Sequence, residues 1–411
     1  MLDRRTAWIV ALVATATMTV SYVDRTTLAV LAPTITKELD ISEAQYGWLT
    51  SAFSFAYLVA TPFAGWWIDR AGARRGLVTS VLAWSAVAAL HALVPGFGVL
   101  LALRIALGMA EGPSFPGAAQ TVSRVLPPAD RSRGFGVLFT GSSIGAMLTP
   151  PLASWLYDLA GWRVAFLGTA VVGLAWLPIW LAFTSRADVR AKMDATEVVA
   201  EAPLARAIPL HHLVLEPVIQ RALIAIFAVA PVIGLVGAWG AKYLVRIHAI
   251  DQAAVGHFLW LPPLGLDLGA VLFGDLAGRQ LRAAGVPPRA LFAGAALMTA
   301  SMALLPLATT PWQAMAIMAV ALAGGGAVYT LVTGDALGRV PRHVVSSAGG
   351  VIAGAQSLAL VVANPLVGMA VAAYGTYDVV AIALGCWVVP GCAVWWAWRP
   401  PAGLVRAART A

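Results

Sequence analysis

Four charged residues, Asp24, Arg25, Arg104 and Glu111, lie inside long apolar stretches of the sequence. A charge at the centre of a membrane-spanning helix costs about 2.5 to 3.5 kcal/mol on insertion scales, so each one requires a function or a partner. Arg104 and Glu111 are seven residues apart and therefore share one face of a helix, separated by about 10.5 Å along its axis. Since each stretch offers one acid and one base, two structural ion pairs are one interpretation.

A binding site is the other interpretation. An arginine presents a planar fork that holds a carboxylate at two points, and Tyr22 shares a helix face with Arg25. A glutamate at the depth of Glu111 can take up and release protons near neutral pH. These residue types therefore predict an internal site for an organic anion and a proton.

Two prolines beside Glu111 favour the binding site. Pro113 and Pro116 each remove a backbone donor, which frees the carbonyl groups of Met109 and Gly112. Polar backbone at membrane depth is tolerated only where it lines a cavity or is buried in protein. The helix that carries Glu111 is therefore expected to bend beside an internal cavity.

The elements that must position these residues are membrane-spanning helices. Of the 411 residues, 60% are apolar and 11% are charged, against about 45 to 50% and about 25% in soluble proteins. At roughly 20 residues per span, the chain is long enough for about a dozen helices. Twelve apolar stretches bounded by charges or turn residues are found, at residues 8–35, 45–67, 77–95, 98–122, 134–158, 163–183, 218–245, 254–277, 289–309, 312–335, 346–373 and 377–398. An all-α integral membrane protein is therefore predicted.

A charged segment divides these stretches into two sets of six. Residues 185–217 hold nine charged side chains, which predicts a cytoplasmic linker between one helical bundle at 1–184 and a second at 218–411. The two halves also resemble each other weakly, since Pro150-Pro151-Leu152 corresponds to Asn364-Pro365-Leu366. Internal repeats of this kind are typical of secondary transporters. Two pseudo-symmetric six-helix bundles are therefore expected.

The distribution of basic residues predicts the orientation in the membrane. With the N-terminus inside, 21 of the 27 Lys and Arg residues lie in cytoplasmic segments, in agreement with the positive-inside rule. Both termini are therefore expected in the cytoplasm, and the net charge of +8 does not indicate nucleic-acid binding. Few lysines beside many arginines and alanines suggest a bacterial genome, and hence the cytoplasmic (inner) membrane.

Signals for cofactors and for enzymatic chemistry are weak. The lysines, Lys37, Lys192 and Lys242, do not follow the glycine of a phosphate-binding loop, so ATP is not expected to bind. The six histidines lack metal-ligand spacing, and neither a metal nor another cofactor is predicted. Residues 141–145, Gly-Ser-Ser-Ile-Gly, formally fit a nucleophile elbow, but that motif needs a strand-to-helix turn, and small residues suit helix packing. An enzyme is therefore not expected.

A short loop motif lies between the second and third apolar stretches. Its residues are Gly65, Asp69, Arg70, Gly72, Arg74 and Arg75. This motif resembles the signature loop of the major facilitator superfamily. Asp69 is expected to face the positive N-terminus of a helix that begins near Ser346, and the arginines to pair with acids in one of two conformations. A charged turn that only fixes the topology is the alternative.

Further motifs in the first half resemble one branch of that superfamily. They are Tyr22-Val23-Asp24-Arg25-Thr26-Thr27-Leu28, Tyr57, and Arg104-x6-Glu111-Gly112-Pro113-Ser114-Phe115-Pro116-Gly117. They are similar to the anion:cation symporters, which include bacterial hexuronate, galactonate and glucarate transporters and the sialin-type carriers. The resemblance implies the major facilitator fold and proton-coupled import of a sugar acid. It covers most of the first half and becomes weaker in the second.

The resemblance also implies which residues contact the substrate. Arg25 would bind its carboxylate, and Tyr22 and Tyr57 would bind its oxygens. In the second half, the candidates for further substrate contacts are Gln356, Asn364 and Tyr329. An interfacial or lipid-facing position is the alternative for Tyr329.

The resemblance also implies which residues couple transport to protons. Asp24 and Glu111 would be the protonation sites, and Arg104 would be the partner of an acid. Asp267, near the middle of the eighth stretch, is a further candidate proton or substrate group. Alternatively, an isolated acid at that position is simply protonated or hydrogen-bonded.

The sequence therefore predicts a monomeric, proton-coupled symporter that imports an organic anion by alternating access. A proton-coupled monocarboxylate transporter is the first alternative, because Asp275 and Arg279 resemble the acid and base that such transporters carry on the eighth helix. At the edge of the membrane the two are otherwise topology charges. A drug or metabolite exporter of the same fold would prefer cationic or apolar ligands. A ligand sensor would need a signalling extension, and none is expected at the termini or in the linker.

Overall fold

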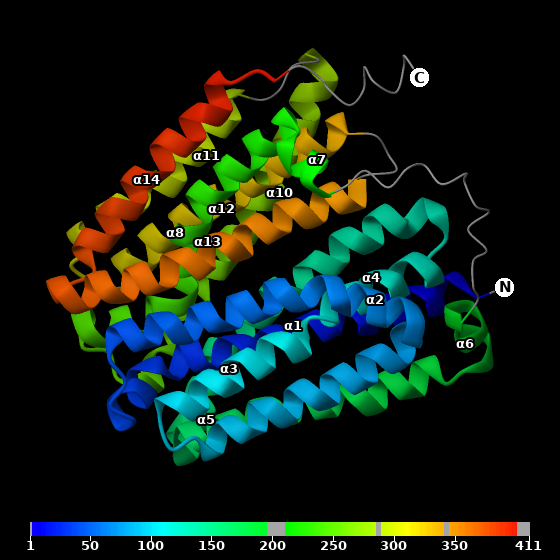
Figure 1. Cartoon of the computed structure of the whole chain (residues 1–411), viewed down its shortest axis with the longest axis horizontal. Coiled ribbons are helices and arrows are strands. Elements are labelled where there is room, and N and C mark those ends of the chain that lie inside the picture. The colour runs from blue at the N-terminus through cyan, green and yellow to red at the C-terminus, as the bar shows by residue number, and fades with distance from the viewer. Residues whose placement is uncertain (1, 195–209, 285–288, 341–344, 401–411) are drawn as a thin grey trace. The chain divides into compact units, whose positions relative to one another are not determined.

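The computed structural model describes residues 2–194, 210–284, 289–340 and 345–400, and every regular element in these ranges is helical (Figure 1). The chain divides into two compact units. Unit 1 comprises Met1–Glu197 and Gly237–Trp260, and unit 2 comprises Val198–Val236 and Leu261–Ala411.

Unit 1 contains the helices that carry the predicted site. They are α1 (Arg4–Glu38), α2 (Glu43–Leu90), the 3₁₀ turn η1 (His91–Leu93), α3 (Phe97–Glu111), α4 (Ser114–Val125), α5 (Pro128–Thr184), α6 (Ala187–Asp194), the second part of α8 (Pro217–His248), η2 (Gln252–Ala254) and α9 (Gly256–Leu259). Unit 2 contains α7 (Leu210–Leu215), the first part of α8, α10 (Leu261–Ala284), α11 (Arg289–Ala300), η3 (Ser301–Leu307), α12 (Pro311–Arg339), α13 (Val345–Tyr374) and α14 (Asp378–Ala397). Glu197, Glu201 and Arg206 of the predicted linker lie outside the described residues.

Ten helical segments among the described residues are long and apolar enough to span a membrane. Two of them, α2 and α5, run for 48 and 57 residues, far more than the roughly 20 that a bilayer requires. α2 breaks at Gly72, where φ is 74°, and α5 breaks at Gly161, where φ is 82°. A positive φ interrupts the helix and turns the chain, and glycine adopts it without steric cost (Figure 1). Both breaks fall where the sequence predicts turns between spans.

Small residues allow α5 to approach α1 closely. A Cβ atom at Gly141 would lie 2.6 Å from the carbonyl oxygen of Thr15, and one at Gly145 would lie 2.5 Å from that of Thr19. The Thr19 hydroxyl also donates a hydrogen bond to the carbonyl of Gly141 at 2.9 Å. The prediction that residues 141–145 serve helix packing is confirmed.

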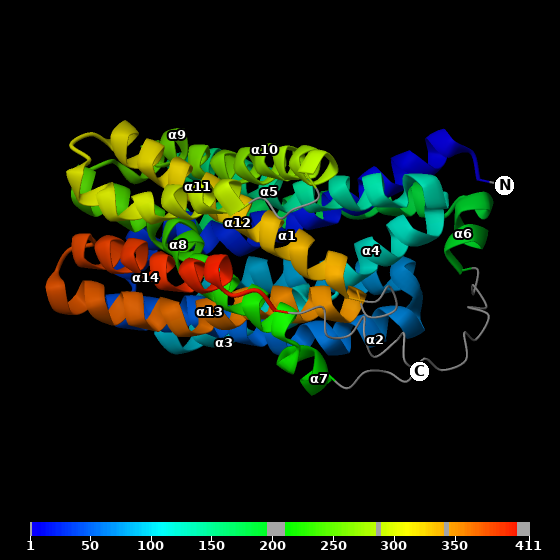
Figure 2. The same ribbon diagram turned by 90° about the horizontal axis from the view of Figure 1, so that it is seen from above.

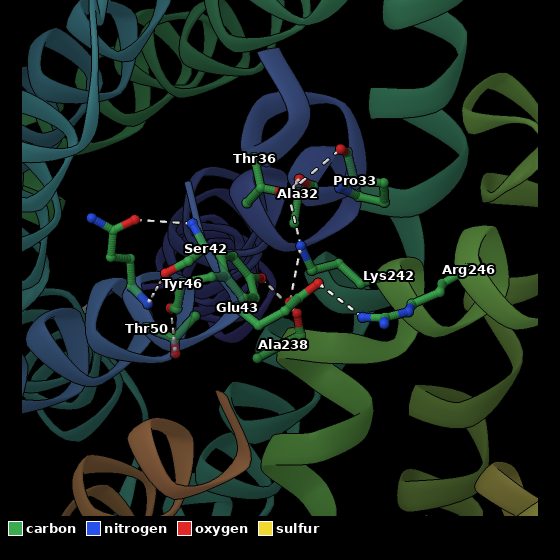
Figure 3. Close-up of polar contacts among 11 residues, drawn as sticks. Ala32, Pro33, Thr36, Ser42, Glu43, Tyr46, Thr50, Ala238, Lys242 and Arg246 are labelled. Carbon is green, nitrogen blue, oxygen red and sulfur yellow. Dashed lines mark hydrogen bonds and ion pairs between the residues drawn. The ribbon is translucent and has the colours of Figure 1, made fainter. Parts of the chain in front are cut away.

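The second part of α8 is bonded to the first helices of the chain (Figure 3). Lys242 is only 6% exposed, and its ammonium group donates to the hydroxyl of Thr36 at 2.7 Å. The same group lies 3.1 Å from one carboxylate oxygen of Glu43, and Arg246 lies 3.4 Å from the other. An ammonium group buried to this extent is stable only with such partners, so the cluster fixes this part of α8 against α1 and α2.

Residues that follow α8 extend these contacts within unit 1. The Gln252 side chain donates to the carbonyl of Val30 at 2.8 Å, and the amide of Gly256 donates to the hydroxyl of Ser154 at 3.0 Å. The sequence predicts one helical bundle that ends at residue 184 and a second that begins at residue 218. In the structure the segment 237–260 groups with the helices of the first half, and the two predicted bundles stay a prediction.

In unit 2, α10 to α14 pack against one another, and α12 contacts α10, α11 and α13 (Figures 1 and 2). Glycines again allow close packing, since a Cβ atom at Gly326 would collide with the backbone of Leu266. At one end of the bundle, Asp335 accepts from Arg339 at 2.6 Å and lies 3.4 Å from Arg221. This cluster neutralises buried charge at the ends of α8 and α12.

Candidate functional site

Arg25 and Glu111 form an ion pair between α1 and α3. Nε and Nη2 of Arg25 lie 3.0 and 2.9 Å from the same carboxylate oxygen, Oε2 of Glu111. The hydroxyl of Ser21 donates to that oxygen at 2.9 Å. Glu111 is fully buried, and its other oxygen, Oε1, has no hydrogen-bond partner. The pair therefore leaves a buried acceptor unsatisfied, which makes it less stable than a two-point contact.

Three aromatic rings surround the guanidinium group of Arg25. Its Cζ atom lies 4.5 Å from the ring centres of Tyr22 and Tyr57 and 4.9 Å from that of Phe53. Cation–π contacts of this kind stabilise a partly desolvated charge by about 0.5 to 2 kcal/mol each. The Arg25 side chain keeps 19% of its surface exposed, whereas Glu111 keeps none. The arginine is therefore the more exposed partner of the pair.

Arg104, on the same helix as Glu111, is bonded to a histidine. Its Nε and Nη2 atoms lie 3.0 and 2.8 Å from Nε2 of His91, and its Nη1 atom lies 3.5 Å from the carbonyl oxygen of Arg25. The sequence predicted an acid as the partner of Arg104. In the structure the fork of the guanidinium group faces an imidazole instead.

Asp24 lies near Arg104 in an enclosed polar environment. Asp24 is 1% exposed, neither of its carboxyl oxygens has a partner at ordinary hydrogen-bond geometry, and the side chain of Trp84 lies nearby. The indole nitrogen of Trp84 and the hydroxyl of Ser85 are likewise buried without hydrogen bonds. Gly173 of α5 leaves the space for this environment, because a Cβ atom there would collide with Ser85 and lie 3.5 Å from Oδ2 of Asp24. A buried carboxyl group with no bonded cation is suited to carry a proton.

The helix that carries Glu111 ends directly after it. α3 ends at Glu111 and α4 begins at Ser114, with Gly112 and Pro113 between them. The predicted interruption is therefore confirmed. The carbonyl of Met109, which the sequence predicted to be free, accepts a hydrogen bond from the amide of Gly112 at 3.3 Å. A tight turn thus replaces the bond that the proline removes.

The predicted loop motif is organised around a glutamine of α4. Nε2 of Gln120 donates to Oδ1 of Asp69 at 3.0 Å, and Oε1 of Gln120 accepts from the amide of Ala73 at 2.9 Å. Gly72 supplies the left-handed turn between Asp69 and Ala73. These bonds hold the loop against α4 within unit 1. The contact between Asp69 and the helix that begins near Ser346 stays a prediction.

The basic residues of this motif point to different partners. The guanidinium group of Arg70 lies 4.2 Å from the ring centre of Trp66. Arg74 donates to the hydroxyl of Ser185 at 3.2 Å, and Arg75 is exposed. At Gly65 a Cβ atom would meet nothing within 4 Å, so close packing does not require glycine there.

The remaining predicted site residues lie in unit 2. Tyr329 of α12, Gln356 of α13 and Asp267 of α10 are half-buried, and Asn364 of α13 is 4% exposed. Tyr329 and Asp267 both interact with neighbouring residues. The roles of these four residues stay predictions.

Several residues of the site were not predicted from the sequence. Ser21 lies four residues before Arg25, and Phe53 lies four residues before Tyr57, so helical spacing could have identified both. Nothing in the sequence distinguishes Trp84 from the other aromatic residues of the apolar stretches. His91 lies in a 3₁₀ turn after α2, where no periodic pattern connects it to Arg104.

Comparison with known proteins supplies the family. A family model described as the Major Facilitator Superfamily matches residues 14–364, more than half of the chain. The chain belongs to the major facilitator superfamily. It is therefore a multi-pass membrane transporter and not an enzyme.

Several similar proteins are named as transporters of sugar acids. The hexuronate transporter of Escherichia coli K12 is 28% identical over 352 residues, which cover 81% of this chain and 80% of that protein. The D-galactonate transporter of Escherichia coli O6:H1 is 26% identical over 381 residues, which cover 87% and 88%. The galacturonate transporter of Dickeya chrysanthemi is 29% identical over 262 residues, which cover 62% and 76%.

Solved structures confirm the superfamily fold. A bacterial homologue of the human lysosomal transporter Spinster, in an inward-facing and unoccupied conformation, matches with a TM-score of 0.79 at 17% identity. The match covers 97% of this chain and all of that one. At this level of identity the likeness concerns the fold alone.

Proposed function

We propose that this chain is a proton-coupled symporter that imports a sugar acid, such as a hexuronate or an aldonate, by alternating access. The observation that carries the proposal is the geometry at Arg25, where a single oxygen of Glu111 occupies the fork of the guanidinium group and the arginine side chain is partly exposed. The relatives named as hexuronate, galacturonate and D-galactonate transporters support sugar acids as the substrate class.

The carboxylates of Glu111 and of the substrate alternate at Arg25, and this couples binding of the anion to binding of a proton. While Glu111 is ionised it occupies the guanidinium fork, so a substrate carboxylate must compete with it. Protonation removes the charge of Glu111 and weakens its bond to Arg25, which leaves the fork free for a two-point contact with the substrate. When the proton leaves towards the cytoplasm, Glu111 competes again and the anion is released.

Other residues complete this proposed site. The hydroxyl groups of Tyr22 and Tyr57 are the candidates to bind the oxygens of the sugar. Asp24, enclosed and without a bonded cation, is the second protonation site. Further substrate contacts from the second half are assigned to Gln356, Asn364 and Tyr329, and Asp267 is assigned to proton or substrate binding.

The architecture that we propose around this site has twelve spans in two six-helix bundles. α2 and α5 would contribute two spans each, because both break at a left-handed glycine. Both termini would lie in the cytoplasm, since 21 of the 27 basic residues are then inside. The protein would work as a monomer in a bacterial cytoplasmic membrane, driven by the proton gradient without ATP or another cofactor. The loop around Asp69 would close in one of the two conformations.

The alternative substrate class is a small monocarboxylate. It depends on Asp275 and Arg279, which form an ion pair at 2.7 Å with side chains that are 51% and 70% exposed. An exposed pair one helical turn apart is typical of a solvated helix surface. The pair therefore gives no indication of a substrate site, and we favour a sugar acid over a small monocarboxylate. A drug exporter is disfavoured because the rings of Tyr22 and Tyr57 already surround the cation of Arg25 and not a cationic ligand.

Uptake into proteoliposomes tests the proposal. A pH gradient, acidic outside, is imposed on vesicles that contain the purified protein, and uptake of labelled galacturonate is measured. Gluconate, glucarate, lactate and a hydrophobic cation are then added as competitors. Sugar acids should compete, and lactate and the cation should not. Absence of galacturonate uptake together with gradient-driven uptake of labelled lactate would establish the monocarboxylate alternative.

Glu111→Gln separates binding from proton coupling. The amide is neutral at all pH values, so it mimics the protonated glutamate and leaves Arg25 free for the anion. Gradient-driven uptake of galacturonate should fall to the level of empty vesicles, while counterflow exchange should continue. Loss of counterflow together with persistent gradient-driven uptake would show that Glu111 is not the coupling residue.

A further inference from the structure

Hydrogen-bond chemistry fixes the protonation state of His91. A guanidinium group has only donors, so the contacts of Nε and Nη2 of Arg104 with Nε2 of His91, at 3.0 and 2.8 Å, require that Nε2 carry a lone pair. The other ring nitrogen, Nδ1, lies 2.7 Å from the carbonyl oxygen of Val87, which can only accept. The proton of the imidazole is therefore on Nδ1, and the ring is neutral in this structure.

The surroundings of His91 hold the ring in this orientation. It is fully buried, and its ring stacks on Phe166 of α5 at 5.1 Å between centres. Phe166 itself packs edge-on against Trp162, so α5 presents aromatic carbon to the imidazole. Val87 lies one turn earlier in α2. The imidazole thus has one polar partner on each nitrogen and no room for water between them.

The edge of Arg104 that His91 occupies is the edge that normally binds carboxylates. Nε and Nη2 form the fork that clamps both oxygens of an acid. Four titratable or charged groups lie within electrostatic range of this guanidinium group, namely Glu111, Tyr46, Asp24 and Arg25. The phenol of Tyr46 is already bonded to the carbonyl of Ala238 at 2.6 Å. Asp24 and Glu111 each retain at least one buried oxygen without a hydrogen bond.

We propose that His91 is the positioning residue of the proton-coupling site: as a neutral acceptor it occupies the fork of Arg104 and prevents that arginine from clamping Asp24 or Glu111. The charge of Arg104 still acts on both acids, but neither is locked in its ionised form. The inference rests on the proposed function, because it concerns how readily these two acids exchange protons during transport.

Removal of the acceptor should release the fork of Arg104. The guanidinium group is then free to bond to an unsatisfied oxygen of Asp24 or Glu111, and such a charge-assisted bond favours the ionised carboxylate. More acid is needed to protonate the clamped group. In His91→Leu, the pH of half-maximal galacturonate uptake should therefore move about one pH unit lower than in the wild type. His91→Gln retains an acceptor oxygen, so it should keep the wild-type pH dependence, whatever its maximal rate.

The two variants are compared in proteoliposomes over a range of external pH. His211→Leu, which removes an exposed imidazole of α7, is the control. An acidic shift in His91→Leu alone supports the proposal. A wild-type profile in His91→Leu, or equal shifts in both His91 variants, would overturn it.

Nitrogen NMR of the wild-type protein tests the same claim without transport or a stable leucine variant. The imidazole nitrogens are labelled, and the His91 signals are assigned by their absence in His91→Gln. They should report the Nδ1–H tautomer, unchanged between about pH 5 and pH 8. Titration of His91 in that range, or the opposite tautomer, contradicts the proposal. If the wild type transports no sugar acid, the proposed function fails, and the NMR result still decides the role of His91 as a neutral acceptor for Arg104.

Discussion

At the scale of single residues, the pairing of Arg25 with Glu111 is asymmetric. Both guanidinium nitrogens bind one carboxylate oxygen, and the other oxygen is buried without a partner. A substrate carboxylate that offered two oxygens would satisfy the fork better. The planar group, and not only its positive charge, is therefore expected to matter for binding.

Arg25→Lys tests this requirement. Lysine keeps the charge but offers a single point of contact, and it loses part of the packing against Tyr22, Tyr57 and Phe53. Galacturonate affinity should fall by about 10- to 100-fold. The dissociation constant is measured by calorimetry on the purified protein at fixed pH. An unchanged constant in Arg25→Lys would show that the fork does not bind the anion.

The sequence was sufficient to identify the charged residues of the site but not all of their partners. Charges at membrane depth are expensive, so Asp24, Arg25, Arg104 and Glu111 could be found from their positions alone. Which acid meets which base depends on how the helices are rotated, and spacing does not specify that. For this reason the bond between Arg104 and His91 could not be predicted.

At the scale of elements, the position of Tyr22 depends on the contact between α1 and α5. A Cβ atom at Gly145 would lie 2.5 Å from the carbonyl of Thr19 and 2.7 Å from Cβ of Tyr22. Gly145→Ala should therefore push α1 away from α5 and cost about 1 to 3 kcal/mol of stability. Both the melting temperature and the affinity for galacturonate should fall.

The matched control is Gly136→Ala on the same helix. A Cβ atom at Gly136 would meet nothing within 4 Å, and alanine is a better helix former than glycine. Its melting temperature should be equal to or higher than that of the wild type, with unchanged affinity. Equal effects of the two substitutions would show that the approach of α1 to α5 does not position the site.

The positions of the helices could be predicted from local features of the sequence. Apolar stretches of about 20 residues, turns with glycine, and prolines beside Glu111 predict where spans begin, end and bend. The breaks at Gly72 and Gly161 and the end of α3 at Glu111 agree with those signals. The turn at Gly112, which satisfies the carbonyl of Met109, is a detail of backbone geometry that proline alone does not determine.

At the scale of the whole molecule, the sequence predicts the superfamily but not the grouping of every segment. A charge-rich stretch marks the middle of the chain, yet the segment 237–260 groups with the first-half helices. Lys242 and Gln252 explain this, because each is bonded to a residue more than 200 positions away. Contacts at such a distance along the chain leave no trace in local composition.

The central claim is that substrate and Glu111 compete for Arg25, and proton uptake on binding tests it most directly. Galacturonate is added to the purified protein in weak buffer near pH 7, and protons taken up per bound anion are measured with a pH-sensitive dye. We expect about one proton per anion in the wild type, because the displaced carboxylate becomes protonated in its buried site. Glu111→Gln should bind the anion with no proton uptake through this residue. Equal proton uptake in both proteins, or binding without any proton uptake in the wild type, would contradict the account.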